Sequence, residues 1–262
     1  MARFGATQIY DPQVRSNTLA RIFLGLFGTF DTCSSHLHFI RYARTIDFDR
    51  VLDAGCGKGK FTFWLAQEYP DAEVYGCDIS AEKIAHCKEV RDLLGIRNAH
   101  FFVQDLRNFE RDQAYDFIFT NHALEHIREN RLVIRKLCRS LKEGGHIYVQ
   151  MPDAVQKRLT FGKRFVKSHE EWAREEHVGQ TLTLESLCTA LEHNNCKTIK
   201  AMYTEGFWGE LRFELSEMAL SYFRSHFLLG LMYPLLRILG HIDAWSEYSD
   251  GNGVLVLAMK ST

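Results

Sequence analysis

Short apolar runs alternate with amphipathic runs of helical length between residues 50 and 152. The apolar runs show no polar face, which is typical of strands buried on both sides of a parallel sheet. The pattern predicts strands at 50–54, 73–78, 99–105, 115–121 and 144–152, and helices at 61–69, 80–94 and 129–142. Pro70 and Asp71 should end the first helix, and the glycines at 144 and 145 should end the last.

The pattern loosens after residue 152 into a charged stretch, and a helix at 183–195 then precedes strands at 196–204 and 253–260. Thr183 is placed to begin that helix. We therefore predict an α/β fold with a Rossmann-like, doubly wound, mostly parallel sheet of seven strands and helices on both faces. Added helices are expected at the N-terminus and before the last strand. The expected units are an N-terminal helical cap (1–45), a core (46–205 and 251–262) and an aromatic helical insertion that acts as a substrate lid (206–250).

Composition narrows the classes of function. The chain has 262 residues, enough for one large domain, and its 32 basic and 33 acidic residues give a net charge of −1. General nucleic-acid binding is therefore not expected. The seven cysteines are dispersed without a CxxC pair, as in a reducing compartment. No secretory signal is evident, and the apolar runs at 19–30 and 227–240 are too short to span a bilayer. We expect a cytoplasmic protein, with peripheral membrane contact as an alternative.

The segment VLDAGCGKGKFT, residues 51–62, carries the first chemical motif. Glycines between a strand and a helix let a ligand approach the main chain closely. The spacing is GxGxG, and Lys60 stands where a dinucleotide fingerprint has its third glycine. Asp53 would repel a pyrophosphate and suits an ammonium group instead. Lys58 and Lys60 are expected at the solvated start of the helix, and Cys56 as a small turn residue.

This motif resembles the first motif of the class I S-adenosylmethionine-dependent methyltransferases. The segments YGCDIS, FFVQDL, YDFIFTNHALEHI and LKEGGHIYVQMP resemble the later family motifs in the same order. The resemblance implies that Asp78 holds the ribose hydroxyls, Ile79 flanks the adenine and Asp105 meets its amino group. S-adenosylmethionine, leaving as S-adenosylhomocysteine, is the implied cofactor, and the implied binding residues are Asp53, Gly55, Cys56, Gly57, Gly59, Asp78, Ile79, Asp105, Leu106 and Asn121.

The fourth motif supplies the candidate catalytic residues, which are His126, Glu125, His122 and, from a later segment, His177. Their HxxEH spelling also fits a metallopeptidase, an alternative that the complete methyltransferase series disfavours. Polyprenyl-catechol and small-RNA 2′-O-methyltransferases bind a divalent ion through this segment, and His177 resembles their later histidine. Because His122 replaces their first glutamate, a divalent metal is possible but not favoured, and no metal ligand is assigned. A proton acceptor and a purely structural pocket floor both remain open.

The acceptor is less defined by the sequence. Flanking helices build the acceptor pocket in this family, and the late insertion is aromatic: Phe207, Trp208, Phe213, Tyr222, Phe223, Phe227, Tyr233 and Trp245. These side chains could line a lipid or glycolipid pocket, lie on a membrane surface, or pack against the N-terminal helices. The resulting hypothesis is methyl transfer to oxygen of a small-molecule, sugar or lipid-linked acceptor. The alternative is a non-catalytic module that binds S-adenosylmethionine.

Overall fold

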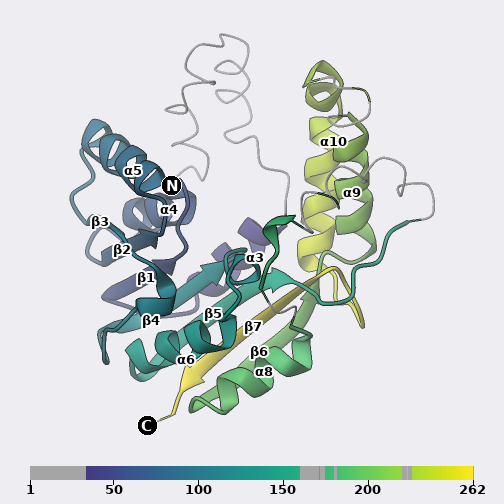
Figure 1. Cartoon of the computed structure of the whole chain (residues 1–262). Helices are drawn as coiled ribbons and strands as arrows, with labels where there is room; N and C mark the ends of the chain where they lie inside the picture. The colour runs from purple at the N-terminus through teal and green to yellow at the C-terminus, as the bar shows by residue number, and fades with distance from the viewer. Residues whose placement is uncertain are drawn as a thin grey trace.

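One sheet of seven strands organises the computed structural model, which describes residues 34–159, 171, 175–179, 182–219, 223 and 226–261. The strand order is β3-β2-β1-β4-β5-β7-β6 (Figure 1). The strands are β1 Arg50–Ala54, β2 Glu73–Asp78, β3 Ala99–Val103, β4 Tyr115–Asn121, β5 Leu141–Pro152, β6 Cys196–Thr204 and β7 Gly253–Lys260. Strands β1 to β5 pair in parallel, and β7 runs antiparallel to both of its neighbours. The predicted doubly wound, mostly parallel sheet is confirmed.

Helices cover both faces of the sheet, and each face has its own apolar core. Helices α3 (Ser35–Ala43), α4 (Lys60–Glu68) and α5 (Ala81–Leu94) contribute to one core, and α6 (Asn130–Ser140) and α8 (Leu184–Glu192) to the other. Neighbouring strand residues serve opposite faces, since Val51 joins the first core and Leu52 the second. This two-sided burial explains why the strands read as continuous apolar runs.

Helices α9 (Phe207–Glu217) and α10 (His226–Trp245) lie between β6 and β7 in sequence and pack against each other beside the sheet (Figure 1). Asp243 of α10 is fully buried and ties this pair together. Its carboxylate accepts hydrogen bonds from the backbone amides of Gly206 and Gly209 at 3.1 and 3.0 Å, and from the hydroxyl of Ser34 at 2.6 Å. The first 33 residues of the expected cap, and Tyr222 of the insertion, lie outside the described residues.

Several element ends differ from the sequence prediction. Helix α6 ends at Ser140, and β5 begins at Leu141 because Leu141 pairs with Tyr115 before the register shifts. The two glycines thus lie inside an irregular part of β5, where Gly144 has a φ of +74°. Strand β3 ends at Val103, because Asp105 caps the short 3-10 turn η2 (Leu106–Asn108) that follows.

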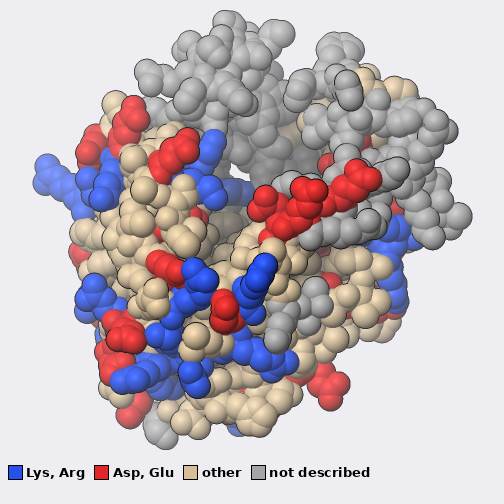
Figure 2. Space-filling model, in the orientation of Figure 1, with Lys and Arg blue, Asp and Glu red and all other residues tan. Residues whose placement is uncertain are grey.

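The distribution of charge on the surface and the state of the cysteines fit what the composition predicts, namely a nearly neutral protein with free thiols. Lys and Arg side chains are intermixed with Asp and Glu on the face that Figure 2 shows. All six cysteines within the described ranges are free thiols. Among those same ranges, no helix combines the length and the apolar character needed to cross a bilayer.

Candidate functional site

The candidate site lies where the chain reverses its direction across the sheet, at the carboxyl ends of β1, β2 and β4. Crevices at such switch points are where open α/β sheets bind ligands. The loop after β1 turns through three glycines with left-handed backbone, Gly55, Gly57 and Gly59, at φ of +92°, +54° and +75°. A Cβ built on Gly57 would meet nothing within 4 Å, so the main chain there is open to a ligand.

Asp53 lies beneath this loop at the end of β1 and is only 2% exposed. The hydroxyl of Thr62, in the first turn of α4, donates to its carboxylate at 2.6 Å. Burial raises the pKa of Asp53 to about 7, although the hydrogen bonds from Thr62 oppose the shift. A cationic group placed beside Asp53 would favour its ionised form.

Asp78 links the end of β2 to the glycine loop. One carboxylate oxygen accepts from the backbone amide of Gly57 and the other from that of Ser80, both at 2.9 Å. Each oxygen keeps a further lone pair, so the carboxylate is held in place and can still accept from ribose hydroxyls.

The residues expected around the adenine differ in how exposed their side chains are and in what those side chains contact. Ile79 is 64% exposed, so its side chain is available to pack against an adenine. Leu106 is buried in the core, where its side chain packs. Asp105 forms a two-pronged ion pair with Arg107, whose side-chain nitrogens lie 2.7 to 3.0 Å away, and this pair lowers the pKa of Asp105. Cys56 is a buried turn residue, and its thiol pKa is raised by the neighbouring Cys87 and by burial.

Asn121 ends β4 with an amide whose oxygen and nitrogen are both buried and have no hydrogen-bond partner within the described part of the chain. Each buried polar atom left in this state costs roughly 1–3 kcal/mol. An amide at the switch point with both groups unsatisfied is therefore a contact that a bound ligand can complete.

His122 and Glu125 form a pair directly beside the glycine loop. His122 has a φ of +53°, and its Nδ1 lies 3.4 Å from Oε1 of Glu125. Burial opposes protonation of the imidazole, but the hydrogen bond and the charge of Glu125 outweigh it and raise the pKa of His122. A Cβ on Gly55 would lie 2.5 Å from Cβ of Ala123, so this segment touches the loop itself.

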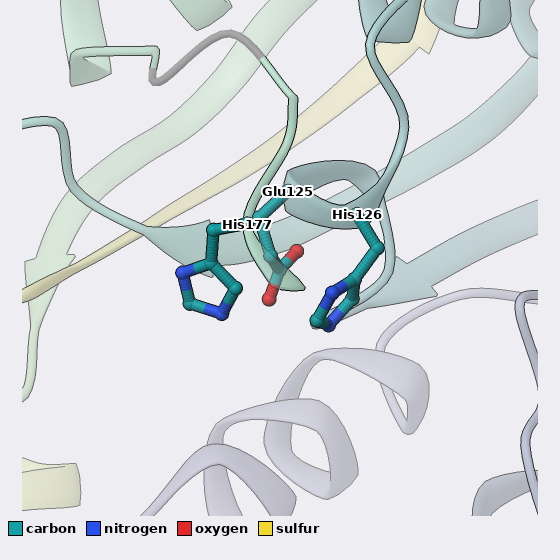
Figure 3. A group of neighbouring side chains, drawn as sticks. All are labelled: Glu125, His126 and His177. Carbon is teal, nitrogen blue, oxygen red and sulfur yellow. The ribbon is translucent and has the colours of Figure 1, made fainter. Parts of the chain in front are cut away.

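His126 and His177 come together although they are distant in sequence. Their ring centroids are 5.0 Å apart, with Glu125 between the two side chains (Figure 3). Gly179 makes this approach possible: its amide donates to the carbonyl oxygen of Glu125 at 2.8 Å, and a Cβ at this position would lie within 2.8 Å of that oxygen. Gly179 was not predicted from the sequence, where its only distinguishing feature is its position two residues after His177.

The metallopeptidase alternative is wrong in its geometry. It needs both histidines of HxxEH on one face of a helix, whereas η3 (Leu124–His126) is a single 3-10 turn. His122 precedes this turn in a left-handed conformation, and the cluster of potential ligands joins Glu125 to His126 and His177 instead.

Lys60 corrects another expectation. It is half-buried at the first position of α4, and burial lowers its pKa to about 7, whereas Lys58 is exposed as predicted. The positive charge of Lys60 opposes protonation of His122 and so acts to lower the pKa of that histidine. The sequence gives no signal that distinguishes a half-buried lysine at this position from a solvated one.

Comparison with known proteins places these features in a family. A family model described as a methyltransferase domain matches residues 47–206. Trans-aconitate 2-methyltransferase of Variovorax paradoxus is 33% identical over 143 residues, which cover 54% of this chain and 52% of that protein. The chain thus spans about half the length of this curated relative.

Solved structures share the fold at lower identity. Phosphoethanolamine N-methyltransferase 2 of Haemonchus contortus in complex with S-adenosyl-L-methionine aligns with a TM-score of 0.62 and 19% identity, over 87% of this chain and 52% of that one. A cyclase, SpnF, aligns with a TM-score of 0.60 and 18% identity, over 87% and 82%. The fold alone therefore does not fix the reaction. Because residues 47–206, more than half of the chain, match the family model, this chain belongs to the methyltransferase-domain family of class I S-adenosylmethionine-dependent methyltransferases.

Proposed function

We propose that this protein transfers a methyl group from S-adenosylmethionine to an oxygen atom of a small-molecule, sugar or lipid-linked acceptor. When bound, the cofactor supplies an electrophilic methyl group on a sulfonium. The open main chain at Gly57, the unsatisfied amide of Asn121 and the exposed side chain of Ile79 fit such a ligand. Asp53 would bind its ammonium group and Asp78 its ribose.

The pair of His122 and Glu125 carries the proposal of an oxygen acceptor. A hydroxyl must lose its proton as it is methylated, and a positioned base accelerates such a step by about 10²–10⁴-fold. Glu125 holds Nδ1 of His122 at 3.4 Å, which leaves Nε2 as the atom that would accept the proton. The pair lies against the glycine loop through Ala123, and is therefore next to the cofactor pocket.

The exposed face of α10 supports an acceptor with an apolar part. Its outward side chains are 39 to 71% exposed and recur every three or four residues along the helix, at Leu231, Leu235, Ile238, Ile242 and Trp245. Phe207 and Phe223 of the same insertion are also more than half exposed. We propose that this lid contacts a lipid-linked acceptor or the cytoplasmic surface of a membrane.

Methyl transfer from isotope-labelled S-adenosylmethionine to a panel of acceptors tests the proposal. The panel should contain phenols, sugars, prenylated phenols, carboxylic acids and amines. We expect label on oxygen, a loss of about 100-fold or more in His122→Asn, and unchanged S-adenosylhomocysteine affinity in that variant. His193→Asn, which changes an exposed histidine, is the matched control. Transfer to amines alone, or full activity in His122→Asn, would contradict the oxygen assignment.

A further inference from the structure

Glu125 has an oxygen atom that nothing in the described structure satisfies. The side chain is only 4% exposed. Oε1 faces His122, whereas Oε2 is buried and has no hydrogen-bond donor among the described residues. A buried carboxylate oxygen without a partner is costly, and a cation is the ligand that best compensates it.

Two histidines lie beside this carboxylate. One potential ligand atom each from Glu125, His126 and His177 lies within 4.8 Å of the others. In Figure 3 the carboxylate points into the space between the two rings. Nδ1 of His126 is 3.1 Å from the carbonyl oxygen of Glu176, which can only accept, so this nitrogen carries the hydrogen. Nε2 of His126 then keeps its lone pair, and a second hydrogen bond of this kind orients most metal-binding histidines.

We propose that Glu125, His126 and His177 bind a divalent transition-metal ion. Two imidazoles and one carboxylate suit manganese, iron, cobalt, nickel or zinc better than magnesium, which prefers oxygen ligands. At bond lengths of about 2.1 Å, the ligand atoms of a tetrahedral ion are about 3.4 Å apart. The three candidate ligand atoms lie within 4.8 Å of one another, so side-chain rotations that bring them closer by about 1.4 Å or less close the set around an ion.

The position of His122 removes the sequence argument against a metal. That argument rests on His122 standing where metal-binding relatives have a glutamate. In the structure His122 is not one of the three candidate ligands, and its Nδ1 lies 3.4 Å from Oε1 of Glu125. The carboxylate thus joins the proposed ion to the candidate proton acceptor.

Three protein ligands leave coordination positions open for water or for an acceptor oxygen. An ion beside the cofactor pocket would hold an acceptor that carries two neighbouring oxygens, such as a catechol, a diol or a hydroxy acid. This use of the ion rests on the proposed methyl transfer to oxygen, whereas binding of the ion does not.

Titration of tag-free protein with Co²⁺ alone, without cofactor or acceptor, tests the site. Calorimetry gives affinity and stoichiometry, and visible d–d absorption of Co²⁺ reports nitrogen and oxygen ligation directly. The variants are His177→Asn and the nearly isosteric Glu125→Gln, with His193→Asn as the matched control. S-adenosylhomocysteine affinity, measured on each variant, shows that the cofactor site and the fold persist.

We expect one Co²⁺ per chain in the unmodified protein and in the control. Affinity should fall by at least about 10- to 100-fold in both ligand variants, the range found when even an outer partner of a metal ligand is lost. The d–d absorption should then revert to that of hydrated Co²⁺. Absence of Co²⁺ binding in protein that binds S-adenosylhomocysteine, or equal affinity in all four proteins, would overturn the metal site and leave the methyltransferase proposal standing.

Discussion

Replacing Asp53 with asparagine tests whether a buried acid lies beneath the cofactor loop. In the folded protein, burial raises the pKa of Asp53 from 3.8 to about 7. The unfolded chain loses that proton near pH 4. Between these pH values the folded state binds the extra proton, so the free energy of unfolding falls by about 1.4 kcal/mol per pH unit as pH rises. Over the whole interval the loss is about 4 kcal/mol.

Urea unfolding at pH values from 5 to 8 measures this effect. Asparagine keeps an acceptor for the hydroxyl of Thr62 but does not titrate. We expect the free energy of unfolding of the unmodified protein to fall by about 3 kcal/mol relative to Asp53→Asn across this range. Asp71→Asn, which changes an exposed acid in a turn, should keep the original pH dependence. Identical pH profiles for the unmodified protein and Asp53→Asn would refute the buried, protonated acid.

The same group should couple cofactor binding to pH. If the cofactor ammonium lies beside Asp53, binding ionises the acid and releases close to one proton at pH 6. Calorimetric titration with S-adenosylhomocysteine in two buffers of different ionisation enthalpy counts that proton. The proton release should vanish in Asp53→Asn. If it persists in that variant, the released proton comes from another group.

Three further substitutions test the local structure by urea unfolding. Gly57→Ala should cost about 1–2 kcal/mol for its left-handed backbone alone, whereas Gly55→Ala adds a 2.5 Å clash and should cost about 1–3 kcal/mol more; equal costs would show that the loop relaxes. Asp243→Ala removes the acceptor of three hydrogen bonds, including that of Ser34, and should cost about 3 kcal/mol or more; a loss under about 1 kcal/mol would mean that α9 and α10 do not depend on it. Thr183→Ala should cost about 1 kcal/mol, because Thr183 accepts from the backbone at the start of α8; an unchanged midpoint would contradict the cap.

The sheet was predictable because its strands are buried on both faces and carry an uninterrupted apolar pattern. The bounds of β1, β2, β4, β6 and β7 match the predicted strands. The ends of α6 and β3 were not predictable from local pattern. Leu141 leaves the helix to pair with Tyr115 on a distant strand, and the side chain of Asp105 stops β3 by capping η2. Long-range pairing and side-chain capping override local preference at such positions.

The site was predictable where it depends on one loop or one strand end. The glycine loop and Asp78 lie where their motif places them, and the backbone bond between Gly57 and Asp78 joins the two. The convergence of His126 with His177 depends on a glycine that lets distant backbone segments touch, which periodicity cannot reveal. The burial of Lys60 depends on the neighbours that surround α4, so its sequence position alone suggested a solvated residue.

Calorimetric titration of S-adenosylhomocysteine into the unmodified protein and Asp78→Ala tests the central claim, that the carboxyl ends of β1, β2 and β4 bind the methyl donor. Asp92→Ala changes an exposed acid on α5 and is the control. We predict one ligand per chain, a loss of about tenfold or more in Asp78→Ala for the unpaired ribose hydroxyls, and unchanged affinity in the control. Absence of binding heat in the folded unmodified protein, or equal affinity in a folded Asp78→Ala variant, would contradict the claim.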